Sequence, residues 1–214
     1  MSIIDLTMPI AEGMMTYPAH WHTRVKICQI GRYGVEGRET RELVLGTHTG
    51  THVDAPRCVI ENGRTIDDIS LDHLCGRADI IDLRSCVNLR SGLPVADRHL
   101  ESLPDVSPVV VLRYDWDQNL ETGKYYHGHP YLSGPAVKLL IARGCRLLAM
   151  DTPSPDQSDD DLMPVHKILL ESGIILVESL VNLHRISVPD FDLIVAPLKI
   201  KGGDGAPARV FAIE

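Results

Sequence analysis

The fold is decided by residues 147–178, which read LLAMDTPSPDQSDDDLMPVHKILLESGIILVE. Apolar runs at 147–151 and 174–178 predict two strands. Between them, residues 163–172 predict a helix, because a proline stands in the first turn and a glycine follows the last. A helical crossover of this kind joins parallel strands. We therefore expect a βαβ unit within a sheet that is at least partly parallel.

The rest of the chain supports a single α/β unit. Six further runs rich in valine, isoleucine and leucine predict strands, at 25–30, 41–45, 79–83, 109–114, 193–197 and 208–213. A second helix is expected from Ser133, a favourable N-cap, to Gly144, which suits the C′ position, and a third, weaker one within 96–103. No repeat, low-complexity tract or linker divides the sequence. We interpret residues 1–214 as one domain with a mixed, partly closed sheet and two or three flanking helices.

The composition describes a chain that buries a core and has no strongly charged partner. The 214 residues are 44% hydrophobic and carry a net charge of −8, without a cluster of lysine or arginine that would suggest a nucleic-acid partner. No apolar run is long enough to span a bilayer, and the N-terminus lacks the pattern of a signal peptide. The five cysteines are scattered along the chain and form no CxxC pair. They are Cys28, Cys58, Cys75, Cys86 and Cys145. The simplest interpretation is a reduced, cytoplasmic protein with neither a nucleic acid nor a membrane as partner.

The stretch GTHTGTHVDAP at residues 46–56 gathers His48, His52 and Asp54 within seven residues. In an extended segment, residues at even spacing point to one side, so these three side chains can converge on one pocket. Imidazoles and a carboxylate are usual ligands of zinc or manganese, and a metal held this way can turn a bound water into a nucleophile. The alternative is a surface turn whose polar side chains satisfy its own backbone. The ligand set favours a metal site.

Two further candidates lie in the βαβ unit. His166 is on the predicted helix and Glu178 ends the following strand, at the edge where α/β sites usually lie. Taken alone, His166 is more simply a core histidine and Glu178 a solvated strand end. Nothing in the spacing of the sequence brings residue 166 next to residue 52.

Four segments of the chain resemble the cyclase/kynurenine-formamidase-like family of metal-dependent hydrolases, and they lie at residues 3–18, 48–56, 129–156 and 165–183. The specific element is HTGTHVDAP at 48–56, which matches the pattern HxGTHxDxP. The resemblance implies a swivelling β/β/α fold, a homodimer or homotetramer, and one or two divalent ions, zinc or manganese. It implies that the ions are held by His48, His52, Asp54, His166 and Glu178.

Cys58 departs from the family pattern. The family reads DAPxH, with a histidine that is proposed to shuttle protons, whereas this chain reads DAPRC. Beside a metal, the thiol could ionise and become a ligand or a nucleophile, or it could be an inert small side chain. His129, in a segment that matches the family, is the other candidate for proton transfer. His20 and His22, near Trp21, and His127, in the aromatic loop before His129, are expected at the surface.

The leading hypothesis is a metal-dependent hydrolase that cleaves a carbon–nitrogen bond of an amide or cyclic amide, similar to an arylformamidase. One alternative is a metal-dependent cyclase or lyase that acts on a keto or hydroxy substrate. Another is a non-catalytic relative that binds metal or a small ligand, because Cys58 replaces the family's histidine. Tyr17, Trp21 and Tyr131 are candidates to line an aromatic-tolerant substrate pocket, although tyrosines in polar loops are also ordinary surface. Asp156, which follows a strand, either orients a ligand or belongs to a plain turn.

Overall fold

The computed structural model describes residues 1–85 and 94–214, so Cys86 lies outside the described residues. The helices are α1 (Tyr33–Glu36), α2 (Leu71–Leu74), α3 (Gly134–Ala142) and α4 (Pro164–Glu171). The strands are β1 (Ile3–Asp5), β2 (Lys26–Gly31), β3 (Thr40–Val44), β4 (His52–Asp54), β5 (Cys75–Asp82), β6 (Pro94–Val95), β7 (Val109–Arg113), β8 (Tyr131–Leu132), β9 (Leu147–Met150), β10 (Ile175–Glu178), β11 (Asp190–Pro197) and β12 (Gly205–Ile213).

The main sheet is mixed and closed on itself. Its strands follow the order β1-β12-β11-β5-β7-β9-β10-β4. An additional pairing of β12 with β4 closes the strands from β12 to β4 into a ring, and β1 pairs with the other end of β12. Strands β5, β7, β9 and β10 are mutually parallel, whereas the pairs that involve β4, β11 and β12 are antiparallel. The parallel pair β9–β10 on either side of α4 confirms the predicted βαβ unit.

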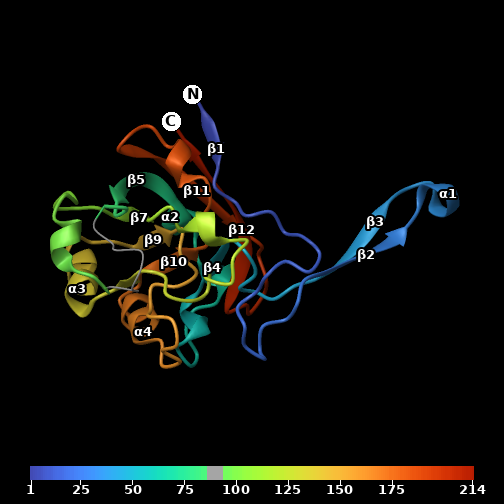
Figure 1. Cartoon of the computed structure of the whole chain (residues 1–214), viewed down its shortest axis with the longest axis horizontal. Coiled ribbons are helices and arrows are strands. Elements are labelled where there is room, and N and C mark those ends of the chain that lie inside the picture. The colour runs from blue at the N-terminus through green and yellow to red at the C-terminus, as the bar shows by residue number, and fades with distance from the viewer. Residues whose placement is uncertain (86–93) are drawn as a thin grey trace.

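The closed sheet separates two hydrophobic cores. Val109 and Val111 of β7 belong to a core shared by strands around the whole ring, whereas Val110 and Leu112 belong to a second core that includes residues of α3 and α4. Alternate residues of a strand face opposite sides of the sheet, so β7 is buried on both faces and reads as a continuous apolar run. Figure 1 shows α3 and α4 on one side of the ring.

The predicted helices differ in how well they match the structure. Helix α3 begins after Ser133, whose Oγ accepts a hydrogen bond from the Ala136 backbone N–H, and Gly144 follows its end with φ of 69°. The third predicted helix, within 96–103, is instead a single 3₁₀ turn over Asp97–Leu100. Strands β1, β6 and β8 were not predicted, because two or three residues give no readable alternation. Among the described residues, no helix has the length and apolar character needed to cross a bilayer.

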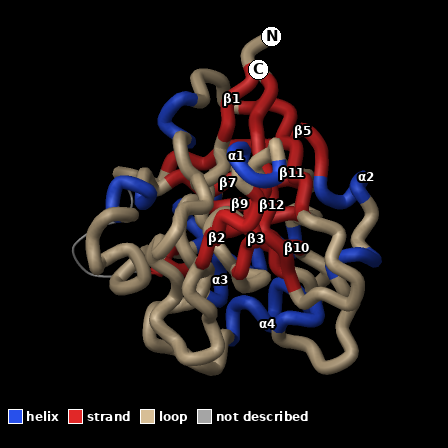
Figure 2. The backbone as a smooth tube through the Cα atoms, turned by 90° about the vertical axis from the view of Figure 1, so that its right-hand side faces the viewer, coloured by secondary structure: helices blue, strands red, loops and turns tan. Residues whose placement is uncertain are grey.

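Strands β2 and β3, with α1 between them, form a hairpin that projects away from the ring in Figure 1. Figure 2 looks at the molecule from that side, so the hairpin overlaps the ring there. We call residues 24–44 the arm. All five residues of β3 are exposed, and the arm also presents the large apolar side chains of Ile30, Tyr33, Val35 and Leu43 to solvent. An isolated two-stranded hairpin has marginal stability in water. The base of the arm contacts the N-terminal segment, since Val25 is buried and the Ile27 N–H donates to Glu12. Beyond this base, the large apolar side chains of the arm remain exposed.

Candidate metal centre

The pairing of β4 with β10 builds the first part of the site. Glu178 lies directly opposite His52, and Asp54 lies opposite Leu176. Side chains opposite each other in an antiparallel pair share one face of the sheet, so His52, Asp54 and Glu178 point to one side while Val53 between them enters the ring core. The even-spacing prediction is confirmed for His52 and Asp54. The register that closes the ring is what brings Glu178 beside them.

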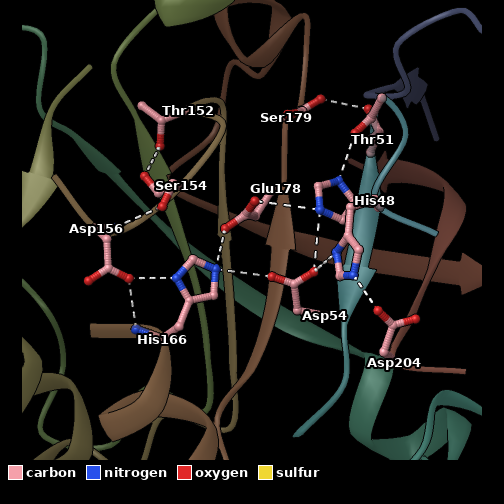
Figure 3. A network of polar contacts seen from close by, with 12 residues as sticks. His48, Thr51, Asp54, Thr152, Ser154, Asp156, His166, Glu178, Ser179 and Asp204 are labelled. Carbon is pink, nitrogen blue, oxygen red and sulfur yellow. Dashed lines mark hydrogen bonds and ion pairs between the residues drawn. The ribbon is translucent and has the colours of Figure 1, made fainter. Parts of the chain in front are cut away.

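The other two predicted ligands arrive from a turn and a helix. His48 lies in the turn before β4, and its Nδ1 is 2.7 Å from Asp54 Oδ1. His166 lies in the first turn of α4, and its Nε2 is 3.2 Å from Asp54 Oδ2 and 3.1 Å from Glu178 Oε1. The structure therefore brings the three predicted histidines together around the carboxylates of Asp54 and Glu178. Figure 3 shows His48 and His166 beside these two carboxylates.

Each of the three imidazoles uses one nitrogen toward the carboxylates and the other toward an outer oxygen. His52 Nδ1 is 2.8 Å from the carbonyl oxygen two residues earlier, while its Nε2 faces Asp54 at 3.3 Å. His166 Nδ1 is 2.6 Å from Asp156 Oδ2, and His48 Nε2 is 2.9 Å from Asp204 Oδ2. Histidines that bind metals are oriented in this way, with the far nitrogen donating to a carboxylate or carbonyl oxygen. The arrangement leaves the near nitrogens aimed at one central region.

Asp156 holds His166 by more than the side-chain contact. Its carboxylate also accepts hydrogen bonds from the backbone N–H groups of Val165 and His166, at 2.7 and 3.0 Å. These donors lie at the start of α4, where a carboxylate is favoured by the unpaired N–H groups and the helix dipole. Of the two interpretations of Asp156, the structure supports the orienting one.

Asp204 was not predicted. It lies in the connection between β11 and β12, 156 positions along the chain from His48, and the available signal is its place between two glycines. A Cβ on Gly205 would lie 2.7 Å from the Val53 carbonyl oxygen and 2.9 Å from His48 Cε1. Glycine at this position therefore allows the connection to approach the histidine closely.

The pKa shifts in the site show that its buried carboxylates are stabilised by neighbouring positive charge. Burial alone would lower the pKa of His48 and His166, but the neighbouring carboxylates raise both pKa values. Burial also raises the pKa of Glu178, and the Asp54 carboxylate raises it further. For Asp54 itself, the positive charges of His48 and His52 overcome burial and hold the pKa well below its usual range. Two buried carboxylates that share one space are stabilised by positive charge.

One carboxylate oxygen of the site accepts no well-aligned hydrogen bond. Glu178 is 3% exposed, and its Oε1 has an ion-pair neighbour in His166 Nε2 at 3.1 Å but no hydrogen bond. Buried polar atoms are nearly always satisfied, and a carboxylate oxygen without a donor is explained by a bound cation. Two sets of side chains have ligand atoms within 4.8 Å of one another: His52, Asp54 and Glu178, and His48, Asp54 and Cys58. The residues present therefore fit a divalent metal.

The two predicted catalytic residues lie at the edge of this cluster. Cys58 ends a 3₁₀ turn over Pro56–Cys58 that directly follows β4, and it is half-buried. Burial raises the pKa of its thiol, and the Asp54 carboxylate adds to the effect. His129 is buried and lines the cavity over the site, and burial lowers its pKa.

A cavity of about 410 Å³ opens over the cluster. Its lining includes Tyr17 and Trp21, as predicted, and adds Tyr126, whose ring stacks edge-on against Tyr17 at 5.7 Å between centroids. Tyr131 lies in β8 and is not among the lining residues. His22, expected at the surface, is half-buried and lines the cavity, whereas His20 and His127 are exposed as expected.

The sequence of the chain is similar to those of known proteins over most of its length. The family model described as "Putative cyclase" matches residues 4–157. A kynurenine formamidase of Salinibacter ruber is 29% identical over 209 residues, which cover 98% of this chain and 96% of that protein.

The fold of the chain is similar to the folds of solved structures. A "potential metal-dependent hydrolase with cyclase activity" superposes with a TM-score of 0.82 at 26% identity, covering 99% of this chain and 96% of that one. Isatin hydrolase A of Labrenzia aggregata, at 24% identity and a TM-score of 0.86 over 99% of this chain and 93% of that one, shares the fold. These likenesses confirm the predicted α/β architecture. Because the family model matches well over half of its residues, the chain belongs to the cyclase family.

Proposed function

We propose that the protein is a metal-dependent hydrolase that cleaves the carbon–nitrogen bond of an amide or cyclic amide, in the manner of an arylformamidase. The observation that carries this proposal is the convergence of three oriented histidines on two buried carboxylates, one of which has an oxygen that accepts no hydrogen bond. The similarity to a kynurenine formamidase over nearly the whole chain supports the reaction class.

One or two divalent ions, zinc or manganese, are proposed to be held by His48, His52, Asp54, His166 and Glu178. When bound, such an ion polarises a carbonyl oxygen and lowers the pKa of water. Asp54 lies between the two sets of ligand atoms, so its two oxygens suit a bridging role. The outer partners of the histidines fix which ring nitrogen faces the ions.

Cys58 and His129 are the proposed catalytic side chains beside these ligands. The lowered pKa of His129 keeps its imidazole neutral at neutral pH, in the form that accepts a proton. Its ring lines the cavity, where it can reach a leaving amine. Cys58 lies on the other side, near His48 and Asp54.

The cavity favours an aromatic substrate without negative charge. Tyr17, Trp21 and Tyr126 supply flat apolar surface at its wall. The described lining contains six carboxylates and no lysine or arginine: Asp54, Asp156, Asp160, Asp161, Glu178 and Asp204. The proposed ions and the histidines offset four of these charges, which leaves Asp160 and Asp161 at the wall. These two carboxylates disfavour an anionic group beside them, so we propose a neutral or cationic aryl amide as the substrate class.

Metal analysis and product analysis of the purified protein test this function. We expect bound zinc or manganese, and consumption of an aryl formamide with release of amine and formate. His52→Ala should lose both metal and activity, whereas His127→Ala, which changes an exposed histidine, should retain both. Activity in a metal-free preparation, or in His52→Ala, would contradict the metal role. Elimination of water from a hydroxy substrate without amide cleavage would instead favour the cyclase or lyase reaction.

We also propose that the chain forms a homodimer or homotetramer through the arm. The arm exposes Tyr33, Val35 and Leu43 and carries five basic and three acidic residues, on a chain whose net charge is −8. A second copy of this chain offers both apolar surface and an excess of negative charge to such an arm. Light scattering should find an oligomer for the wild type and a smaller species for Val35→Asp. A monomeric wild type would contradict the proposal.

Residues 1–214 are proposed to form one hydrolase domain that works in a reducing, cytoplasmic environment. The support is that the four described cysteines, Cys28, Cys58, Cys75 and Cys145, are free thiols.

A further inference from the structure

The part of the centre that faces the 3₁₀ turn after β4 has an unusual set of groups. The ring of His48, the carboxylate of Asp54 and the thiol of Cys58 place one nitrogen, one oxygen and one sulfur within 4.8 Å of one another. Bonds from zinc to these atoms measure about 2.0–2.3 Å, so two ligands of one tetrahedral ion lie roughly 3.5 Å apart. The three atoms lie within 4.8 Å of one another, so side-chain movements of little more than about 1 Å bring them to the spacing of ligands that share an ion.

The backbone holds the thiol at this place. The Cys58 N–H donates to the carbonyl oxygen of Ala55 at 2.9 Å, and the Ala55 N–H donates to the carbonyl oxygen of Asp204 at 3.0 Å. On the other side, the Arg57 N–H donates to the carbonyl oxygen of Arg64 at 3.0 Å. The turn is thus tied to the same connection whose carboxylate orients His48. A ligand group that is held by its backbone is already oriented before the ion binds.

We propose that Cys58 Sγ is a metal ligand, and that it completes a second ion subsite with His48 and Asp54. The proposal rests on the proposed function, because it requires that the centre binds metal. The first subsite consists of the buried ligands His52, His166 and Glu178, and Asp54 belongs to both.

The chemistry of sulfur decides what this ligand does. A divalent ion beside a thiol favours the thiolate, and the proton leaves to solvent as the sulfur–metal bond forms. Thiolate is a soft ligand that suits zinc, whereas manganese prefers oxygen. The second subsite should therefore select zinc over manganese, and His129 remains as the side chain that carries the proton of the reaction.

Cobalt substitution tests the ligand directly. The full chain is stripped of metal with a chelator and reloaded with Co²⁺, and its absorption spectrum is recorded. Wild type should show a thiolate-to-cobalt charge-transfer band in the near ultraviolet. Cys58→Ser should lose this band while it keeps the visible cobalt bands of the remaining site. Cys28→Ser is the matched control, because Cys28 is an exposed cysteine of the arm, and it should keep the band.

Zinc affinity gives a second readout. Cys58→Ser should weaken binding of the second zinc by at least the ~10–100-fold that follows loss of an outer partner, and it should reduce the preference for zinc over manganese. If wild type binds cobalt without a thiolate band, or if the band persists in Cys58→Ser, the Cys58 ligand is disproved while the proposed metal centre stands. If wild type binds no metal, both the ligand and the proposed function fail.

Discussion

The centre has two sides that meet at Asp54, and they differ in how they are built. The inner side consists of His52, His166 and Glu178, which are 5%, 2% and 3% exposed and stand on β4, α4 and β10. The outer side consists of His48, Cys58 and Asp204, which stand on turns and on the β11–β12 connection. There the side chains of His48 and Asp204 are 17% and 43% exposed.

This difference bears on Cys58, which stands where the family resemblance implies a histidine. The inner ligands are fixed by strand register, so a changed side chain there would leave a buried charge without its partners. The outer ligands are held by local turns, and solvent screens part of their charge. A change of side chain is therefore better tolerated on the outer side, where Cys58 lies.

The largest effect is expected from Asp54, because both sides depend on it. Asp54→Asn keeps the shape but removes the charge that lies 2.7–3.3 Å from the three histidines. We expect loss of both ions and a fall in kcat/KM of at least ~10³-fold, equivalent to about 4 kcal/mol of transition-state stabilisation. Metal content and steady-state kinetics measure this. A variant that keeps one ion would show that one side binds metal without Asp54.

The two sides were also unequally readable from the sequence. His52 and Asp54 could be placed on one face because a strand alternates its side chains. Their meeting with Glu178 depends on the register of β4 against β10, more than 120 residues apart, and it was reached through family resemblance. Asp204 could not be found, since its role depends on how a glycine-rich connection packs against His48.

In the fold, too, the elements with a local sequence pattern were predicted and those that depend on distant neighbours were not. Long apolar runs such as β7 and the βαβ unit of β9, α4 and β10 carry a pattern of their own, and they were predicted. The short strands β6 and β8 owe their existence to neighbours distant in sequence, so no local pattern reveals them. The arm was predicted only as two strands. Its projection from the ring (Figure 1) and the exposure of its apolar side chains are not encoded in a sequence pattern.

Substitutions of Asp156 and Asp204, which orient His166 and His48, allow the inner and outer sides to be compared directly. Asp156→Asn removes the charge that orients His166, and Asp204→Asn does the same for His48. We expect metal affinity to fall ~100-fold for Asp156→Asn and ~10-fold for Asp204→Asn, because Asp156 is buried and also accepts two hydrogen bonds at the start of α4. Zinc titration monitored by calorimetry measures both. Equal losses would contradict the distinction between the sides.

Protons compete with metal for the same histidines. In metal-free protein, the pKa of His48 is raised above 6.5, so its pairing with the carboxylates stabilises fully below about pH 6.5 and is lost as pH rises through the raised value. Metal must displace this proton, so the stabilisation by metal grows with pH, about tenfold in affinity per unit for each proton displaced.

The gap in Tm between loaded and metal-free protein should therefore widen from about pH 6 to about pH 8. Thermal unfolding followed by circular dichroism measures it at each pH. His48→Ala should weaken the pH dependence of this gap in Tm. His127→Ala, which changes an exposed histidine, should leave the pH dependence unchanged. A gap that stays constant would mean that the ions displace no proton.

The smallest effect is expected at the rim, beyond the outer side. Trp21 lines the cavity but is 65% exposed, so it offers a substrate only part of its surface. Trp21→Ala should raise KM for an aryl formamide a few-fold, about 1 kcal/mol, and leave kcat and metal content unchanged. Val106→Ala changes another exposed apolar residue, one outside the cavity lining, and should alter neither constant. If Trp21→Ala lowers kcat instead, Trp21 contributes to the chemical step. The outer side of the centre would then include a residue beyond His48, Cys58 and Asp204.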